Sequence, residues 1–228
     1  MPSSATKPSV GETSPVRVAV FASGGGTNLQ TLLDRCRPPE AAHIVLVASD
    51  EPAAGALYRA RTAGVATHVI PDPGDGSAIV EVLRDVEIDL IVLAGYLRLV
   101  PLGVVRAFEG RMINIHPALL PAFGGKGMYG TRVHRAVIES GATVSGVTVH
   151  LVNEEFDRGK IVAQWPVPVK AADTPETLAE RVLEVEHQLL PAVVLTAARN
   201  GKVVRLPFPQ AAFSAGDAPA VTNTLVST

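Results

Sequence analysis

The regular alternation of short apolar runs with helical stretches over the first half of the chain is the feature that most constrains its fold. Four runs fit buried strands, each followed by a stretch that fits a helix, in the order 16–23, 27–36, 43–49, 53–63, 67–70, 77–85, 89–95 and 101–108. Short apolar runs separated by helices of about ten residues are typical of parallel strands joined by crossover helices. We therefore predict an α/β fold, a Rossmann-like, doubly wound and mostly parallel sheet with helices on both faces.

The pattern changes after residue 116. We expect a glycine-rich loop over 123–130 and a helix over 131–140. Two strands, 143–152 and 160–169, follow with a polar connection between them, and a long helix runs over about 173–200. The long helix begins at the capping signal Asp173-Thr174-Pro175-Glu176, and Gly201 ends it. The change divides the predicted domain into two halves, 16–116 and 117–206.

A chain of 228 residues fits one large domain with modest extensions, because a domain has about 150 residues on average. We assign this domain to residues 16–206. Residues 1–15 and 207–228 are irregular and carry no hydrophobic period, so we interpret both as tails, the first of them disordered.

The charge and hydropathy of the chain exclude several classes of partner. Lys and Arg total 20 against 22 Asp and Glu, so no basic surface is expected for a nucleic-acid partner. The longest apolar stretch, Leu90 to Leu97, has eight residues, whereas a membrane helix needs about 20. The N-terminus lacks the apolar segment of a secretory signal, and the single cysteine, Cys36, cannot form an internal disulfide. We therefore expect a cytoplasmic protein that is bound to neither membrane nor nucleic acid.

The segment SGGGTNLQ lies where the first strand turns into the first helix. Gly24, Gly25 and Gly26 allow close approach of an anion, and the amides of Thr27 and Asn28 point at it together with the helix dipole. This predicts a phosphate site. The loop lacks the Lys-Ser/Thr ending of triphosphate loops, and only Asp50 or Glu51 could read a dinucleotide ribose, so those two nucleotide classes fit poorly. The alternative is a tight turn without a ligand.

Asn114-Ile115-His116-Pro117 is expected at the carboxyl end of a central strand, where ligands bind in open α/β sheets. Alternation along the strand places Asn114 and His116 on the same side. An amide donor beside an imidazole suits acyl transfer, which needs a donor for the developing oxyanion and a group that moves a proton. The alternative is a hydrogen-bonded pair with a structural role.

Asp157 lies in the connection between the last two predicted strands, and His150 lies on the strand before it. A carboxylate near His116 would raise the pKa of the imidazole and fix its orientation; the alternative is a polar hairpin loop. The other histidines show no metal-ligand spacing, so we expect them at structural or surface positions; they are His43, His68, His134 and His187. We expect no metal site.

In this order, SGGGTNLQ, LAGYLRLVP, INIHPALLP, SGVTVHLVNEEFDRG and RVLEVEH closely resemble the phosphoribosylglycinamide formyltransferase family over residues 16–206. The resemblance implies a formyltransferase fold with a phosphate-binding first half and a folate-site second half. It also implies transfer of a formyl group from the co-substrate 10-formyltetrahydrofolate to the amine of phosphoribosylglycinamide, a step of de novo purine biosynthesis. No metal or redox cofactor is implied, since the formyl group on the carrier is already activated.

The resemblance also implies roles for individual residues. Asn114 would donate to the formyl oxygen, and His116 would stabilise the tetrahedral intermediate and assist proton movement. Asp157 would raise the pKa of His116 and order a water, and His150 would support the site. The ribosyl phosphate and ribose would be held by Gly26, Thr27, Asn28 and Glu186, the last of which would otherwise be interpreted as an exposed helix carboxylate. The folate would lie against Leu97, Arg98, Leu99, Val100, Asn114, Asn153 and Asp157.

The chain departs from the family pattern at three places. Many relatives have an arginine for the folate tail after the third strand, where PDPGDGSAI has none, so the replacement is Arg61, Arg84 or no residue at all. Many have Lys or Gln at the position of Leu183, which removes one polar contact near the phosphate. The loop that contains Lys126 is longer than usual and rich in glycine, which suggests a mobile lid. We hypothesise that Lys126 or His134 closes over the phosphate or the folate tail.

Three alternatives to this function are considered. Methionyl-tRNA formyltransferase needs a second domain for tRNA, and formyltetrahydrofolate hydrolase typically carries an N-terminal regulatory domain; neither is expected in this sequence. A non-catalytic nucleotide-binding module would require no role for Asn114, His116 or Asp157. The resemblance is compatible with a monomer and with a homodimer.

Overall fold

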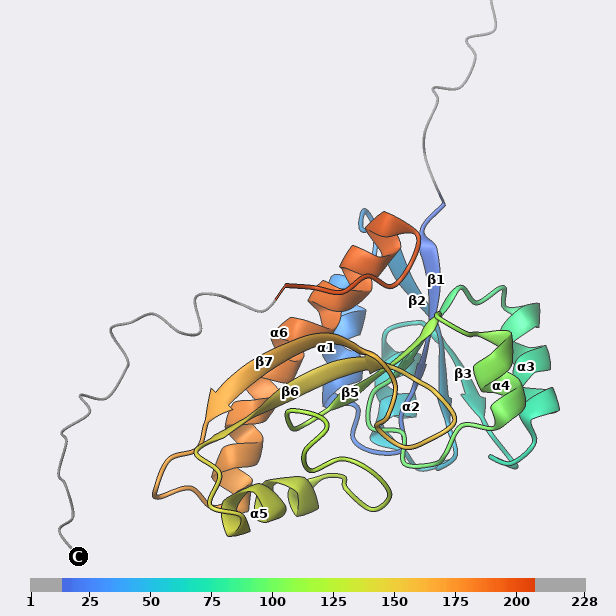
Figure 1. The fold of residues 1–228 in the computed structure, drawn as a ribbon. Helices are drawn as coiled ribbons and strands as arrows, with labels where there is room; N and C mark the ends of the chain where they lie inside the picture. The colour runs from blue at the N-terminus through green and yellow to red at the C-terminus, as the bar shows by residue number, and fades with distance from the viewer. Residues whose placement is uncertain (1–13, 208–228) are drawn as a thin grey trace, which may run out of the picture.

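Seven strands form one sheet in the order β3-β2-β1-β4-β5-β6-β7 in the computed structural model, which describes residues 14–207 (Figure 1). The strands are β1 (Val16–Phe21), β2 (Ala42–Ser49), β3 (Ala66–Val69), β4 (Leu90–Leu93), β5 (Met112–His116), β6 (Val144–Leu151) and β7 (Ile161–Pro168). The helices are α1 (Thr27–Arg35), α2 (Gly55–Thr62), α3 (Gly76–Asp85), α4 (Leu102–Ala107), α5 (Thr131–Glu139) and α6 (Pro175–Asn200). The predicted α/β class is confirmed, and every predicted strand and helix is present.

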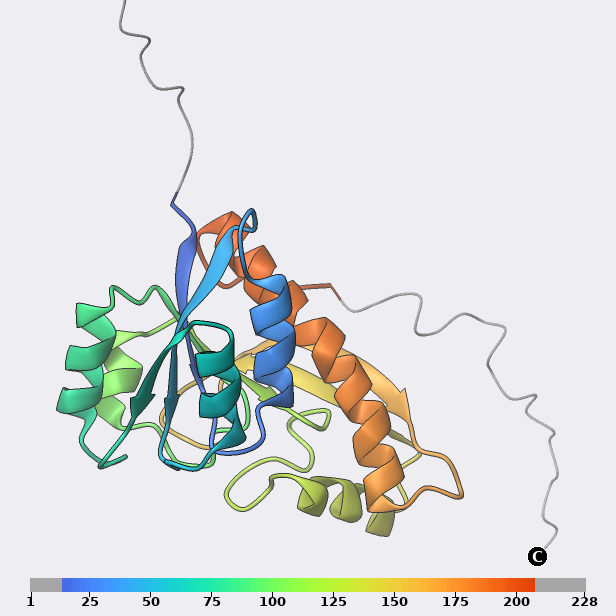
Figure 2. The same cartoon turned by 180° about the vertical axis from the view of Figure 1, so that it is seen from behind.

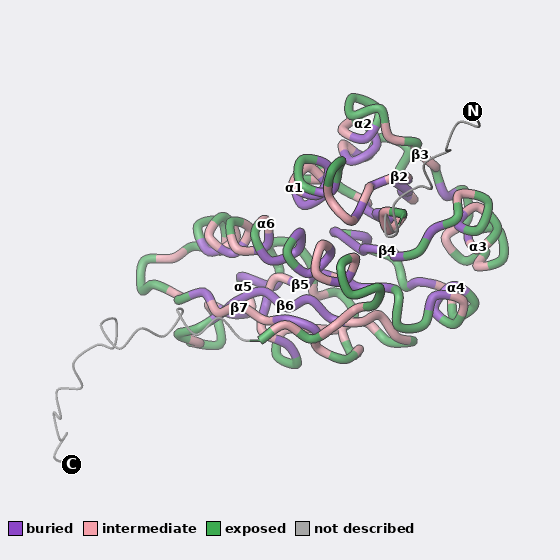
Figure 3. The backbone as a smooth tube through the Cα atoms, turned by 90° about the horizontal axis from the view of Figure 1, so that it is seen from above, coloured by how far each residue is buried: buried purple, intermediate pink, exposed green. Residues whose placement is uncertain are grey.

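Helices cover both faces of the sheet, which explains why its strands are so apolar. One buried cluster joins the strands to α1, α2 and α6, and a second joins them to α3 and α4 (Figures 1 and 2). All four residues of β4 are buried, and the central strands form the continuous buried layer visible in Figure 3. Such strands must be hydrophobic on both sides, as the sequence indicated.

The direction of chain winding reverses between β1 and β4. From β1 the chain proceeds outwards to β2 and β3, then returns to β4 on the other side of β1. The loops that follow β1 and β4 therefore diverge at a topological switch point, where open α/β sheets bind ligands. Both strands end up to two residues earlier than predicted, because the chain turns here: the Ser23 amide donates to the Gly95 carbonyl at 2.9 Å.

The antiparallel part of the sheet aligns the candidate residues. β5 pairs with the parallel β4 on one side and with the antiparallel β6 on the other. This register sets Asn114 opposite His150 and His116 opposite Thr148. The polar residues of the two strands are thus neighbours at the carboxyl end of β5.

The long helix α6 has the ends that its sequence predicted. Thr174 and Thr177 form a reciprocal capping box, Pro175 occupies the first turn, and Gly201 takes the left-handed conformation with φ 65°. Within residues 14–207, no helix combines the length and apolar character that crossing a membrane would require. The predicted tails lie almost entirely outside the described residues.

Candidate active site

A cavity of about 680 Å³ opens at the carboxyl end of the sheet. This volume is typical of small-molecule sites, which measure about 300–1,000 Å³. Its walls come from the loops after β4, β5 and β6, from the start of α5, from one side of α6 and from Asn28 in the first turn of α1, whereas Gly26 and Thr27 do not line it. All four predicted catalytic residues line it, namely Asn114, His116, His150 and Asp157.

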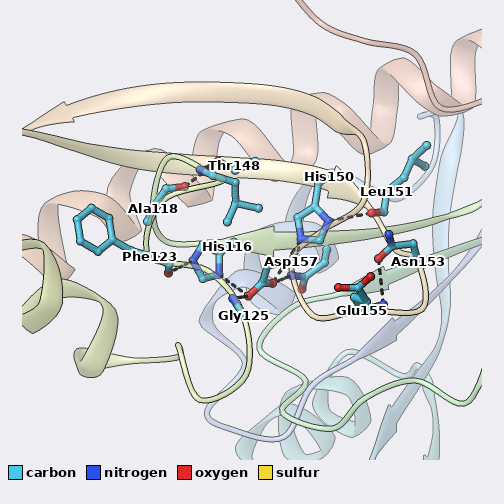
Figure 4. Close-up of polar contacts among 12 residues, drawn as sticks. His116, Ala118, Phe123, Gly125, Thr148, His150, Leu151, Asn153, Glu155 and Asp157 are labelled. Atoms are coloured by element: carbon cyan, nitrogen blue, oxygen red, sulfur yellow. Dashed lines mark hydrogen bonds and ion pairs between the residues drawn. The ribbon is translucent and has the colours of Figure 1, made fainter.

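Asp157 lies between the two histidines (Figure 4). Its Oδ2 is 3.6 Å from His116 Nδ1 and its Oδ1 is 3.6 Å from His150 Nε2. Oδ2 also accepts a hydrogen bond from the Gly125 amide at 2.8 Å. The backbone at Asp157 has φ 56°, in the left-handed region that a non-glycine residue rarely adopts. The strained backbone directs the carboxylate towards both imidazoles. Its hydrogen bond with Gly125 fixes the loop 123–130.

Burial and hydrogen bonding act in opposite directions on the Asp157 carboxyl. Burial would raise its pKa, but the nearby His150 and His116 and the hydrogen bond from the Gly125 amide outweigh burial and lower it. The carboxylate is therefore ionised at neutral pH.

The hydrogen bonds of His116 define its tautomer. Its Nε2 is 2.8 Å from the Phe123 carbonyl, which can only accept, so Nε2 carries the proton and Nδ1 faces Asp157. Burial lowers the pKa of His116, and the opposing effects of Asp157 and the Phe123 carbonyl only partly offset it. The expectation that Asp157 raises this pKa is thus correct for its own contribution, whereas the net pKa lies below the ordinary value. His116 rests in the neutral form, ready to accept a proton.

His150 orients the amide of Asn114. Its Nδ1 donates to the Leu151 carbonyl at 2.8 Å, so Nε2 accepts from the Asn114 Nδ2 group at 3.0 Å. The same Nδ2 group also donates to Asp157 Oδ1 over a longer 3.3 Å. One hydrogen of the amide makes the shorter bond to His150, and the other makes the longer and weaker bond to Asp157.

The loop of Gly24, Gly25 and Gly26 after β1 packs tightly against α2. Gly26 has φ 74°, and a Cβ at this position would lie 2.8 Å from Ala56 Cα. The Gly24 carbonyl accepts from the Ala56 amide at 3.1 Å, and the Gly25 carbonyl accepts from Arg59 Nε at 2.8 Å. Gly26 is therefore required for packing, and it sets Thr27 at the exposed start of α1.

Asn28 and Glu186 form a buried pair on the cavity wall. Asn28 Nδ2 donates to Glu186 Oε2 at 2.8 Å, and Glu186 is 7% exposed. Asn28 Oδ1 is buried and has no partner among the described residues. The interpretation of Glu186 as an exposed carboxylate is wrong. Its spacing of four from Leu178 and Val182 places it on the buried face of α6, a signal that the sequence does contain.

Replacement of Glu186 by glutamine should stabilise the protein at high pH. Burial raises the pKa of Glu186 from 4.5 to about 7, against a smaller lowering effect of Asn28. The folded state therefore holds this proton more tightly, and about 3 kcal/mol of stability is lost as pH rises from 4.5 to about 7. Glutamine stays neutral, so we expect E186Q to exceed the wild type in free energy of unfolding by about 3 kcal/mol above pH 7.

Urea unfolding at about pH 5 and about pH 8 measures this effect, because the two proteins should differ little at the lower pH. E184Q changes an exposed carboxylate of the same helix and serves as the control. A difference between E186Q and the wild type that is independent of pH would contradict the assignment.

The segment after β4 provides a largely apolar wall. Leu97, Arg98, Leu99 and Val100 all line the cavity, as does Asn153 opposite them. Leu97 and Leu99 are 46% and 47% exposed, so two large apolar side chains face the opening. Arg98 donates from Nε to Asp50 Oδ2 at 2.7 Å. Asp50, which could have read a dinucleotide ribose, is thus bonded to protein.

One cavity residue, Tyr96, escaped the sequence interpretation, which gave His134 two alternative positions. His134, expected at a structural or surface position or closing over a ligand, is 4% exposed and lines the cavity, and burial lowers its pKa to about 4. Tyr96 lines the same cavity, and its buried hydroxyl has no partner in the described part of the chain. Lys126 and Leu183 also line the cavity, whereas Arg84 lines a separate depression between α3 and α4. Over residues 14–207, His, Cys, Asp and Glu form no group of three or more that could hold a metal ion.

The sequence of this chain was compared with models of known protein families. The family model described as formyl transferase matches residues 16–194. The chain belongs to the formyl transferase family.

Individual relatives of this formyl transferase have informative names. It is 49% identical over 186 residues to the chloroplastic phosphoribosylglycinamide formyltransferase of Arabidopsis thaliana, covering 78% of this chain and 64% of that protein. It is 38% identical to the phosphoribosylglycinamide formyltransferase of Haemophilus influenzae, covering 78% and 85% of the two chains. The solved structure of glycinamide ribonucleotide transformylase 1 from Symbiobacterium toebii superposes with a TM-score of 0.76 at 39% identity, over 84% of this chain and 94% of that one. The expected formyltransferase fold is confirmed.

Proposed function

We propose that this protein transfers the formyl group of 10-formyltetrahydrofolate to the amine of phosphoribosylglycinamide, giving phosphoribosyl-N-formylglycinamide and tetrahydrofolate in de novo purine biosynthesis. The observation that carries the proposal is the convergence of Asn114, His116, His150 and Asp157 on one cavity. The relatives from Arabidopsis thaliana and Haemophilus influenzae are named phosphoribosylglycinamide formyltransferase, which supports this acceptor.

The two ends of the cavity fit the two substrates. The Asn28 and Glu186 end offers the amides at the start of α1 for a phosphate and a buried acceptor for ribose hydroxyls. The end lined by Leu97, Leu99 and Val100 offers an apolar wall for a flat ring, with Arg98 and Asn153 as polar partners. When bound, 10-formyltetrahydrofolate supplies an activated formyl group.

Each catalytic residue then has one task. The second N–H of Asn114 leaves its long bond with Asp157 and donates to the formyl oxygen, where negative charge develops. Neutral His116 accepts the amine proton at Nδ1, which faces Asp157, and returns it to the leaving nitrogen of tetrahydrofolate as the bond between that nitrogen and the formyl carbon breaks. Asp157 stabilises the resulting imidazolium by its charge, and His150 holds Asn114 in its donating orientation.

The absorbance of the folate tests this function. Purified protein is mixed with 10-formyltetrahydrofolate in the presence and absence of phosphoribosylglycinamide, and tetrahydrofolate formation is recorded. We expect turnover only when the amine is present. Turnover without the amine would indicate a formyltetrahydrofolate hydrolase instead, and no turnover in either mixture would indicate a non-catalytic nucleotide-binding module.

We propose that Lys126, in the loop 123–130, contacts one of the two substrates. Its exposed side chain lines the cavity, and the loop is fixed at Gly125 by Asp157. We expect Lys126→Ala to raise the KM of one substrate about fivefold, the loss that one exposed charge contact to an anion causes, with kcat nearly unchanged. Lys202→Ala, an exposed lysine beyond the far end of α6, is the control. Unchanged KM values for both substrates would remove Lys126 from the binding site.

The remaining features of the proposal concern setting and assembly. The enzyme acts on small molecules, needs no metal because its donor is already activated, and works in the cytoplasm. Cell fractionation tests the compartment, and sedimentation at several protein concentrations distinguishes a monomer from a homodimer.

A further inference from the structure

Asp50 joins the loop after β1, which contains Ser23 and Gly24 to Gly26, to the segment that lines the apolar end of the cavity. It directly follows β2, and its side chain is 2% exposed. Oδ1 accepts a hydrogen bond from Ser23 Oγ at 2.6 Å, and Oδ2 accepts one from Arg98 Nε at 2.7 Å. One buried carboxylate is thus shared by residues from two different loops of the site.

The order of the strands makes this contact possible. β1 lies between β2 and β4, so the Asp50 carboxylate reaches from the end of β2 past β1 to the loop after β4. Ser23 also accepts from the Leu97 amide through Oγ at 3.0 Å and donates from its own amide to the Gly95 carbonyl at 2.9 Å. Three loops are therefore tied together at the switch point of the sheet.

The contacts are of the strong kind. Burial would raise the pKa of Asp50, but the hydrogen bonds from Ser23 and Arg98 outweigh it and lower the pKa, so the carboxylate is charged. Hydrogen bonds to an ionised acceptor are about twice as strong as neutral ones. The hydrogen bond of Arg98 to Asp50 uses Nε, and its Nη2 lies 3.9 Å from Glu51 Oε1 in a longer ion pair. The side chain is 56% exposed and lines the cavity, so Nη1 faces no protein acceptor among the described residues and is open to a ligand.

We propose that Asp50 is a positioning residue that couples the binding of the two substrates. The inference rests on the proposed function, in which the phosphate binds the loop after β1 and the folate lies against Leu97 to Val100. Because Ser23 and Arg98 share one carboxylate, a ligand that orders either loop holds the other in its binding position. Phosphoribosylglycinamide thus raises the affinity for folate, and folate raises the affinity for phosphoribosylglycinamide by the same factor.

Calorimetric titration with tetrahydrofolate, alone and with saturating phosphoribosylglycinamide, tests the coupling. We expect the second ligand to tighten tetrahydrofolate binding to the wild type at least about fivefold, the lower end of typical couplings. An asparagine places an NH2 group, which cannot accept a hydrogen bond, at one of the two positions that Ser23 Oγ and Arg98 Nε now contact. In Asp50→Asn the gain should therefore fall below about twofold, and the KM of both substrates should rise about fivefold while kcat stays within about twofold.

Two variants separate positioning from stability. Asp173→Asn removes a similarly buried carboxylate, 4% exposed, whose bonds to Arg181 of 2.7 and 2.8 Å lie outside the cavity. It should lower the melting temperature as much as Asp50→Asn does yet keep full coupling. Ser23→Ala preserves the pair of Asp50 and Arg98 and should also lose the coupling.

Three outcomes overturn the inference. Fivefold coupling that persists in Asp50→Asn removes this residue from the link, and a wild type that binds both ligands independently removes the link itself. A wild type that binds neither ligand overturns the proposed function, and the inference with it.

Discussion

Asp157→Asn is expected to lower kcat by about 10² to 10⁴, the range associated with general acid–base groups. Asparagine has the same shape and tolerates the left-handed backbone at φ 56°, and its amide oxygen can still accept from the Gly125 amide. The substitution therefore removes the charge with little change in packing. Without that charge, the imidazolium formed when His116 takes up a proton loses its counter-ion, now 3.6 Å away.

The pH profile distinguishes this electrostatic role from a structural one. His116 acts in its neutral form, so kcat/KM falls as pH drops through its pKa, which burial sets below the ordinary 6.5. The Asp157 charge raises this pKa, so its removal lowers the pKa further. We expect the acidic limb of the profile to move to lower pH in Asp157→Asn, measured between about pH 5 and pH 8.

Asp89→Asn is the matched control for this experiment. Asp89 also accepts a backbone hydrogen bond at 2.8 Å, from Arg17, but it lies at the amino end of β4, away from the cavity. Its substitution should leave kcat and the pH profile unchanged. A fall in kcat of less than about twofold in Asp157→Asn would remove Asp157 from the mechanism.

The fold was predictable because its signals are local. Buried parallel strands require continuous apolar runs, and the glycines and caps that end the elements are visible in the sequence, as Gly201 and the capping box at Thr174 illustrate. The ends of β1 and β4 were less accurate, since the loops there are held by contacts between distant segments, such as the bond from Ser23 to Gly95.

The candidate site was predictable only in part, because some of its properties depend on contacts between distant segments. Asn114 and His116 share one strand, so alternation alone puts them on one side. The net pKa of His116 depends on how deeply the folded chain buries the ring, which no spacing reveals. Asp50 reaches past β1 to bond Arg98, and such a contact follows from strand order rather than from any local pattern.

Asn114→Ala should cost about 10² to 10³ in kcat, the effect of removing one oxyanion donor. Alanine cannot donate to the formyl oxygen, and the smaller side chain leaves His150 Nε2 without the donor that now lies 3.0 Å away. The interaction is made mainly as negative charge develops, so kcat and kcat/KM should fall together while the KM of both substrates changes little. The acidic limb of the pH profile should stay in place, because the charge of Asp157 beside His116 remains.

Gln164→Ala controls for the loss of an amide near the site. Gln164 Nε2 donates to the Leu120 carbonyl at 2.9 Å and to Thr148 Oγ1 at 3.1 Å, but its side chain does not line the cavity. We expect it to lower the melting temperature while kcat stays within about threefold, well short of a donor's contribution. If Asn114→Ala lost less than about tenfold in kcat, His116 alone would have to stabilise the developing oxyanion. His116 would then have to donate from Nδ1 as the imidazolium, and the rate would rise towards low pH instead of falling, so the same pH profile decides between the two residues.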